Sequence, residues 1–352
     1  MAEPPRRSRG QAARLFVVST VLLSGCGLAA AVVSPAERTI ASPAAAEVAT
    51  DAPALGAERV AAAPSTTTTT TTSLPPSRPE IVDAYSVRVD DAIVYGRGDT
   101  TAGPIDLVLD LYVPVAADGR DRIAGQPAAV LVHGGGFTQG SRTNAGLPEL
   151  ATTLASHGIV TVSIDHRLAG DEPIVTTAAL TAYFDGLDPA TVSDWLAETD
   201  VVAAAIEDTV LAAEWLLELG VDPDRVVLGG SSAGAIASLY AAHLGDDAGL
   251  AAPGIAAVIS LWGGYTVTPG LAEPLDAGDA PIWIAHGTAD PIVPYEYASV
   301  IAWRGGSVGV DVVVHGLDGV GHGFPAIDLW SDRAASGVVL IDDLVDFLRL
   351  HA

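Results

Sequence analysis

The 352-residue sequence has no lysine and only one cysteine, and both absences exclude kinds of chemistry. Its 17 basic residues are all arginines, which excludes a Schiff-base lysine, a phosphate-binding loop ending in Gly-Lys-Ser/Thr and a Ser-x-x-Lys nucleophile. The single cysteine, Cys26, rules out an internal disulfide. Positive charge is scarce as well. The formal net charge of −26 argues against nucleic acid as a partner, because phosphates require a basic face.

The first 26 residues have the pattern of an export signal. Four arginines precede an apolar run over residues 15–23 that is too short to span a bilayer. The run ends in Leu-Ser-Gly-Cys at Cys26, which resembles the lipobox of bacterial lipoproteins, where cleavage exposes the cysteine for lipid attachment. We therefore expect residues 1–26 to be a signal peptide with a lipobox. The protein would be exported and held by a lipid at the outer face of a bacterial membrane. The alternative is an ordinary signal peptide and a secreted protein.

Residues 27–79 consist mainly of Ala, Pro, Ser and Thr, with seven consecutive threonines at Thr66–Thr72. Such a composition buries too little apolar surface to offset the entropy of ordering the chain. We expect a disordered tether whose ends lie on the order of 40 Å apart.

Strand and helix patterns alternate from residue 80 to residue 352. We expect strands at Val87–Val89, Leu107–Val113 (ending at Pro114), Ala128–Val132, Ile159–Ile164, Val226–Leu228, Ala256–Leu261, Ile282–Ala285 and Val310–Val314. We expect helices at Leu147–His157, Leu196–Leu219, Ala233–Leu244 and Val338–Leu350. This alternation predicts one α/β domain, with a mostly parallel sheet covered by helices on both faces. Residues 169–198 interrupt the rhythm, and we expect them to form a small cap over the site.

The stretch 230–234, Gly-Ser-Ser-Ala-Gly, lies between an expected strand and an expected helix and fits the pattern G-x-S-x-G. A sharp strand-to-helix turn crowds the positions two before and two after the nucleophile, so both must be small. Only Ser232 has glycine at both positions. Ser232 is therefore the expected nucleophile and Ser231 its neighbour.

A serine hydroxyl needs a base and the base needs an orienting carboxylate. His322 lies in a glycine-rich loop between the last expected strand and the last helix, which favours it as the base; His286 and His315 are minor rivals. Asp290 follows an expected strand and precedes a proline, which favours it as the acid over Asp318.

A glycine run follows the strand at Ala128–Val132 in the sequence His-Gly-Gly-Gly-Phe, residues 133–137. Its backbone N–H groups can face a substrate without obstruction by side chains. We expect an oxyanion hole formed by Gly134, Gly135 and Gly136 together with the N–H of Ala233.

These motifs resemble those of the α/β-hydrolase superfamily. The segments DLYVP, VLVHGGGF, SIDHRLAG, GGSSAG, HGTADPIVP and GHGF occur in the expected order from about Leu107 to His351. The resemblance is to the HGGG-type esterase and lipase branch, including bacterial carboxylesterases and feruloyl-esterase-like enzymes. Part of that branch carries an acidic residue at the position of Ser231 and an aromatic residue at that of His166.

The resemblance implies a serine carboxylic-ester hydrolase that acts through an acyl-enzyme on small or aryl esters, without metal or cofactor. Aromatic residues that could contact the substrate are Phe137, Trp195, Trp262, Tyr265 and Phe324. Two other functions stay open, namely a serine peptidase on the same fold and a non-catalytic, surface-tethered binding module.

Overall fold

The computed structural model describes residues 81, 85–187, 199–244, 254–265 and 274–352. The expected signal peptide with Cys26, the tether at 27–79 and the 188–198 part of the expected cap lie outside these ranges. The strands are β1 (Ser86–Gly98), β2 (Ile105–Val115), β3 (Ala128–Val132), β4 (Val160–Ile164), β5 (Val226–Ser231), β6 (Ile255–Leu261), β7 (Ile282–Gly287) and β8 (Val312–Leu317). The helices are α1 (Leu147–Ser156), α2 (Ala178–Asp185), α3 (Thr199–Glu218), α4 (Ala233–His243), α5 (Glu296–Val308), α6 (Leu340–His351) and the short 3₁₀ helix η1 (Ala169–Asp171).

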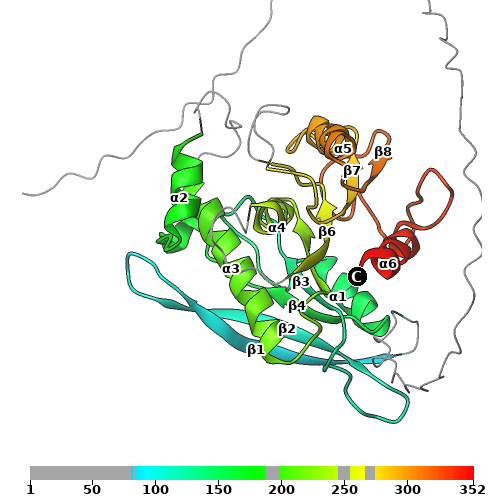
Figure 1. Ribbon diagram of the computed structural model, residues 1–352, viewed down its shortest axis with the longest axis horizontal. Helices are drawn as coiled ribbons and strands as arrows, with labels where there is room; N and C mark the ends of the chain where they lie inside the picture. The colour runs from blue at the N-terminus through cyan, green and yellow to red at the C-terminus, as the bar shows by residue number, and fades with distance from the viewer. Residues whose placement is uncertain (1–80, 82–84, 188–198, 245–253, 266–273) are drawn as a thin grey trace, which may run out of the picture. The chain divides into compact units, whose positions relative to one another are not determined.

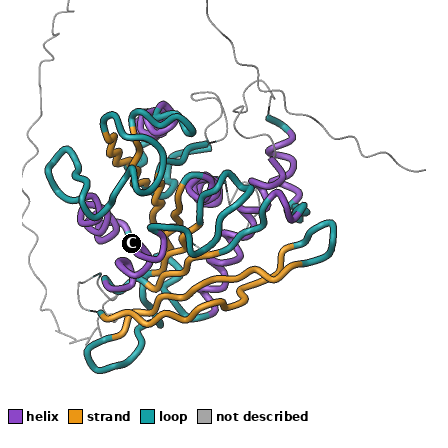
Figure 2. Tube along the Cα trace, turned by 180° about the vertical axis from the view of Figure 1, so that it is seen from behind, coloured by secondary structure: helices purple, strands orange, loops and turns teal. Residues whose placement is uncertain are grey.

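The eight strands form one sheet in the order β1-β2-β4-β3-β5-β6-β7-β8 (Figure 1). The β1–β2 and β2–β4 pairs are antiparallel and the remaining pairs are parallel. The central strands β3, β4 and β5 are buried along their whole length, which explains their continuous apolar runs. The edge strand β1 is partly exposed and extends with β2 as a long ribbon along one side of the sheet (Figure 2).

Helices cover both faces of the sheet and bury a separate apolar cluster on each. One cluster contains side chains of α3, α4 and α5, such as Ile206, Ile236 and Ile301. The other contains side chains of α1 and α6, such as Leu150 and Leu344. The expected α/β sheet with helices on both faces is therefore confirmed.

The structure differs from the expected elements in several places. Strand β1 is much longer than the expected strand at Val87–Val89, and helix α2 lies within the segment expected to be a cap. Strand β2 runs through Pro114, because β4 pairs only with Leu109–Tyr112 and leaves the proline one neighbouring strand, β1. Strand β8 begins two residues later than expected, at Val312. Helix α5 was not expected, because the consecutive glycines at 305 and 306 weaken its helical pattern.

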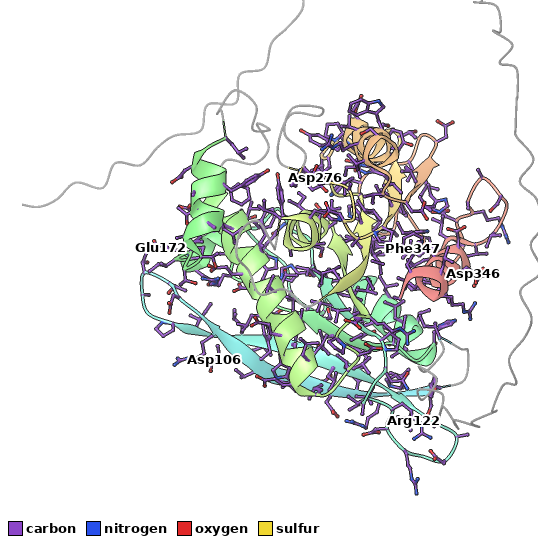
Figure 3. The ribbon with its side chains drawn as sticks, in the orientation of Figure 1. Asp106, Arg122, Glu172, Asp276, Asp346 and Phe347 are labelled. Carbon is purple, nitrogen blue, oxygen red and sulfur yellow. The ribbon has the colours of Figure 1, made fainter. Side chains whose placement is uncertain are left out.

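Many charged side chains are exposed, and Figure 3 labels Asp106, Asp276 and Asp346 among them. The side chains of these three aspartates are 60–71% exposed. Within the described ranges, no helix has both the length and the apolar character needed to cross a bilayer.

Candidate active site

A pocket of about 480 Å³ lies at the carboxyl ends of the parallel strands. This is the edge at which ligands bind in open α/β sheets, and the volume suits a small molecule. The pocket walls come from the loops that follow β3, β5, β6, β7 and β8. The lining residues are Gly134, Gly135, Gly136, Gln139, Asn144, Ala145, Ser231, Ser232, Ala233, Trp262, Ile292, Val293, His322, Gly323 and Phe324.

Ser232 sits on a strained turn between β5 and α4. Its backbone has φ +52° and ψ −118°, a conformation that residues other than glycine rarely adopt. The turn is held by a 2.8 Å hydrogen bond from the Ser232 N–H to the carbonyl of Leu261 at the end of β6. The strain thereby presents one hydroxyl to the pocket.

The glycines at 230 and 234 are required by close backbone contacts. A Cβ at Gly230 would lie 2.4 Å from the carbonyl oxygen of Val132, and one at Gly234 only 2.1 Å from it. Real Cβ atoms do not approach a backbone oxygen this closely, so neither position tolerates a side chain without displacing β3 or the turn. This is the crowding that the sequence pattern predicts around Ser232.

The imidazole of His322 lies between Ser232 and Asp290, within hydrogen-bond distance of both. Nε2 of His322 is 2.9 Å from Oγ of Ser232, and Nδ1 is 2.6 Å from Oδ2 of Asp290. A carboxylate only accepts, so Nδ1 carries the proton and Nε2 is left to accept from the serine hydroxyl. The arrangement is a relay from the acid, through the imidazole, to the hydroxyl.

The carboxylate of Asp290 is fully buried. Its Oδ1 accepts hydrogen bonds from the N–H groups of Ile292 at 2.8 Å and Val293 at 3.0 Å. The rival acid, Asp318, instead contacts the hydroxyl of Thr288 at 3.4 Å.

The other histidines that the sequence offered lie elsewhere. Nε2 of His315 is 2.7 Å from Oδ1 of Asp343, on helix α6. His286 lies beside Asp290 and does not line the pocket.

Gly135, Gly136 and Ala233 line the pocket together with Ser232. Within the part of the chain that the structure describes, none of their three N–H groups has a hydrogen-bond acceptor. Gly135 lies so close to Gln139 that a Cβ would be 1.9 Å from the Gln139 carbonyl oxygen, so the loop also requires glycine here. These three donors are available to an anionic oxygen near Ser232.

Gly134 differs from this expectation. Its N–H donates to Oγ of Ser231 at 3.1 Å, so the group is occupied and turned away from a ligand. Ser231 thus fastens the glycine loop to the end of β5. The prediction that the Gly134 N–H is an oxyanion donor is therefore not supported.

Two stacked histidines pack next to the glycine loop at residues 134–136, and one of them forms a hydrogen bond with it. The rings of His133 and His166 lie 4.3 Å apart, and Nδ1 of His133 donates to the carbonyl of Gly134 at 2.7 Å. Burial, together with the neighbouring His166, lowers the pKa of His133 to about 4, and burial also lowers the pKa of His166. Both rings are therefore neutral near pH 7, which allows them to stack without repulsion.

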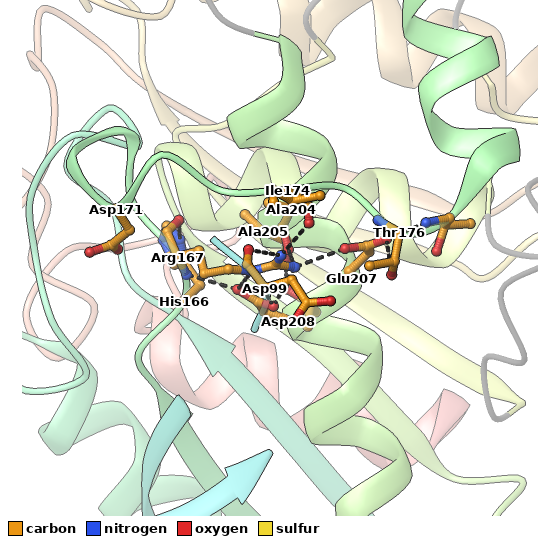
Figure 4. A network of polar contacts seen from close by, with 12 residues as sticks. Asp99, His166, Arg167, Asp171, Ile174, Thr176, Ala204, Ala205, Glu207 and Asp208 are labelled. Atoms are coloured by element: carbon orange, nitrogen blue, oxygen red, sulfur yellow. Dashed lines mark hydrogen bonds and ion pairs between the residues drawn. The ribbon is translucent and has the colours of Figure 1, made fainter. Parts of the chain in front are cut away.

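Arg167 anchors the segment next to His166 through a buried polar network (Figure 4). Its guanidinium contacts both carboxylate oxygens of Asp208 and donates to Glu207 at 2.8 Å and to the carbonyls of Asp99 and Ile174. Burial raises the pKa of Asp208 to about 6, against the attraction of Arg167, which lowers it. The network ties the segment after β4 to helix α3.

The expected substrate contacts are only partly at the pocket. Trp262 and Phe324 line it, with their rings edge to face at 4.8 Å. Phe137 is 3% exposed and packs into the core with an edge contact to His166, and Tyr265 is buried against His243. Neither of these two lines the pocket, so both predictions are wrong, and Trp195 lies outside the described residues.

Several lining residues were not anticipated, among them Gln139, Asn144, Ile292 and Val293. All four follow the ends of strands β3 or β7 in the sequence, so a systematic reading of every loop after a strand would have found them. The described part of the expected cap, residues 169–187, contributes no residue to the pocket.

The described residues contain no group of three or more His, Cys, Asp or Glu side chains placed to hold a metal ion.

A family model for the alpha/beta hydrolase fold matches residues 129–274. Among solved structures, esterase 2 of Thermogutta terrifontis phosphoramylated by tabun aligns with a TM-score of 0.52 and 23% identity, over 77% of this chain and 95% of that one. The propionate-bound form of the same esterase gives a TM-score of 0.51 and 22% identity over the same shares. The fold is therefore the alpha/beta hydrolase fold.

Among curated proteins, a non-reducing polyketide synthase of Penicillium brasilianum is 34% identical over 97 residues, which are 26% of this chain. The chain covers only 4% of that protein's length. The sheet order, the strand-to-helix turn at Ser232 and the family match over residues 129–274 all agree with the alpha/beta hydrolase fold.

Proposed function

We propose that the protein is a serine hydrolase that cleaves carboxylic esters through an acyl-enzyme. The observation that carries the proposal is the unbroken line of contacts from Asp290, through His322, to a hydroxyl on a strained turn that opens into the pocket. The solved relatives are described as esterases, one with propionate bound, and this supports esters with short acyl chains as substrates.

In the first step Oγ of Ser232 attacks the ester carbonyl while Nε2 of His322 takes the hydroxyl proton. The carbonyl oxygen becomes negatively charged and accepts hydrogen bonds from the N–H groups of Gly135, Gly136 and Ala233. His322 then gives its proton to the leaving alcohol. Asp290 holds the imidazole in the required tautomer and stabilises the imidazolium.

In the second step a water molecule gives a proton to Nε2 of His322 and attacks the acyl-enzyme. The tetrahedral intermediate collapses, the proton returns to Oγ of Ser232 and the carboxylic acid leaves. This chemistry uses only side chains and backbone groups of the protein, and no step requires a metal or a cofactor.

The two adjacent serines provide a matched test on the full chain with p-nitrophenyl acetate and butyrate. We expect Ser232→Ala to reduce kcat by about 10³-fold or more, since only binding and the oxyanion donors would remain. Ser231→Ala removes the acceptor of the Gly134 N–H without touching the nucleophile, so a loss of about tenfold or less is expected. Equal losses in the two variants, or wild-type activity in Ser232→Ala, would reject the assignment.

Covalent labelling gives a second measurement. One solved form of the related esterase is phosphorylated by paraoxon. We expect paraoxon to add one diethylphosphoryl group to this chain, on Ser232, as read from the mass of the tryptic peptide. Label elsewhere, or an unchanged label in Ser232→Ala, would contradict the proposal.

We further propose that the chain is exported and lipid-anchored through Cys26, with a small-molecule ester as its substrate. The arginine-rich start, the short apolar run and the sequence Leu-Ser-Gly-Cys support this proposal. The mass of the mature N-terminus tests it: an unmodified Cys26, or cleavage at another residue, would reject lipid anchoring.

A further inference from the structure

His286 is a buried side chain beside the relay that the proposed reaction leaves without a role. It is the fifth residue of β7, and its side chain is completely buried. Nε2 of His286 lies 2.8 Å from the carbonyl oxygen of Val293 and 3.3 Å from Oδ2 of Asp290. The polar edge of the ring therefore faces the loop that carries the acid.

The ring of His286 is neutral and carries its proton on Nε2. The carbonyl of Val293 can only accept a hydrogen bond, so Nε2 must be the donor. Burial lowers the pKa of His286, which keeps the ring uncharged near pH 7. Its contact with Asp290 is thus between a neutral N–H and a carboxylate, and it is not an ion pair.

His286, Val293 and Asp290 form a closed circuit of contacts. The carbonyl of Val293 accepts from His286, and the N–H of the same residue donates to Oδ1 of Asp290 at 3.0 Å. Oδ1 is thereby turned toward the loop, which leaves Oδ2 directed at Nδ1 of His322. A change that releases Val293 also releases the carboxylate.

The other nitrogen of the ring shows that this placement has a cost. Nδ1 of His286 is buried and has no hydrogen-bond partner within the described residues, and an unsatisfied buried polar group is unfavourable. An apolar side chain of similar size would avoid that cost. The titratable groups that face the ring are Asp290, His322 and the edge-on ring of Tyr295, 5.8 Å away. The contacts of Nε2 are what an apolar replacement would lose.

We infer that His286 is a positioning residue, which uses the carbonyl of Val293 to hold the Asp290 carboxylate in line with His322. The inference rests on the proposed ester hydrolysis. The hydrogen bond of His286 to Val293, at 2.8 Å, is shorter than its contact with Asp290, at 3.3 Å. We therefore expect His286 to act more by fixing the loop that carries Asp290 than by reducing the negative charge on the Asp290 carboxylate. His286 does not line the pocket.

Two nearly isosteric replacements separate the hydrogen bond from the packing. His286→Gln keeps an N–H donor at the reach of Nε2, whereas His286→Met fills the same space without a donor. We expect kcat to fall about 10- to 100-fold in the Met variant with KM little changed, and to stay within about threefold of wild type in the Gln variant. If the Met variant does not fold, His286→Asn, whose amide is too short to reach Val293, replaces it with the same expected loss.

The pH profile of kcat/KM separates positioning from a merely structural role. A misoriented Asp290 stabilises the imidazolium less, so the acid limb of the profile should move to lower pH in the Met variant and remain in place in the Gln variant. Equal kinetics in the Met and Gln variants would overturn the inference. An acid limb that moves to higher pH would also overturn it, because charge withdrawal would then dominate.

His243→Gln is the matched control, since it removes another buried neutral histidine, which bonds Tyr265 and the carbonyl of Ala280 instead of the relay. Its acid limb should not move. A readout independent of activity is the low-field proton NMR signal of the His322 Nδ1–H, which should move upfield in His286→Met alone. An inactive wild-type chain would therefore refute the proposed hydrolysis, while the NMR signal would still decide the role of His286.

Discussion

A single methyl group added at Gly234 tests whether backbone contacts hold Ser232 in place. In Gly234→Ala the new Cβ would lie 2.1 Å from the carbonyl oxygen of Val132, 2.5 Å from its carbonyl carbon and 2.6 Å from the carbonyl oxygen of His133. Ordinary contacts of a Cβ begin near 3.4 Å, so the overlap exceeds 1 Å. All three atoms belong to the backbone at the end of β3 and cannot rotate away.

The expected result has two parts. Overpacking typically lowers the free energy of unfolding by about 1–3 kcal/mol, and this severe overlap should fall at the upper end of that range. Any relief requires the turn to move by about 1 Å relative to β3, and a displacement of that size between reacting groups reduces kcat about 100-fold. Denaturant unfolding measures the first effect, and hydrolysis of p-nitrophenyl acetate by the folded fraction measures the second.

Gly306→Ala is the matched control. Gly306 lies within α5, has a helical backbone and has no atom within 4 Å of an added Cβ. Alanine there should raise the free energy of unfolding by about 0.5–1 kcal/mol and leave activity unchanged. If Gly234→Ala were as stable and active as Gly306→Ala, the steric account of the strained turn would be refuted.

Two further predictions concern stability. Burial lowers the pKa of His243 from 6.5 to about 4, so the unfolded chain takes up this proton at a higher pH than the folded chain does. The free energy of unfolding should therefore be highest above about pH 6.5 and should fall by about 3 kcal/mol as the pH is lowered to 4. Urea unfolding at several pH values should show this slope, and an equally steep slope in His243→Gln would contradict the assignment. Arg167→Met leaves the buried Asp208 without its cation and should lower the free energy of unfolding by about 3–5 kcal/mol. Arg97→Met breaks an exposed pair with Asp106 and an exposed hydrogen bond to the carbonyl of Pro104, and should lower it by less than about 1 kcal/mol. Similar unfolding midpoints for these two variants would show that the buried network contributes little.

The order of elements could be predicted from the sequence because parallel strands buried on both faces appear as uninterrupted apolar runs. β3 matched its expected bounds completely, and the parallel strands beside it matched within a few residues. Helix α5 could not be predicted, because two adjacent glycines have low helix propensity and the helix is stabilised by the burial of its apolar side chains in the folded protein.

The three residues of the relay could be singled out because each follows a different strand at the same edge of the sheet. What the sequence could not supply were contacts that depend on side-chain direction. Whether the ring of Phe137 faces the pocket or the core depends on its packing against His166, and the engagement of the Gly134 N–H depends on a hydroxyl 97 residues away. Spacing alone also shows no difference between a histidine that contacts the nucleophile and one, such as His286, that lies behind the acid.

Main-chain atoms position Ser232. The carbonyl of Leu261 on β6 accepts the hydrogen bond of its N–H, and the carbonyl of Val132 on β3 packs against the two glycines of the turn. The pocket walls, by contrast, include residues such as Asn144, Ile292 and Phe324, which do not position Ser232. For the proposed ester hydrolysis, reactivity and substrate preference therefore depend on different parts of the protein. An engineer can exchange wall residues to admit a bulkier acyl or alcohol group while the machinery of bond cleavage keeps its shape.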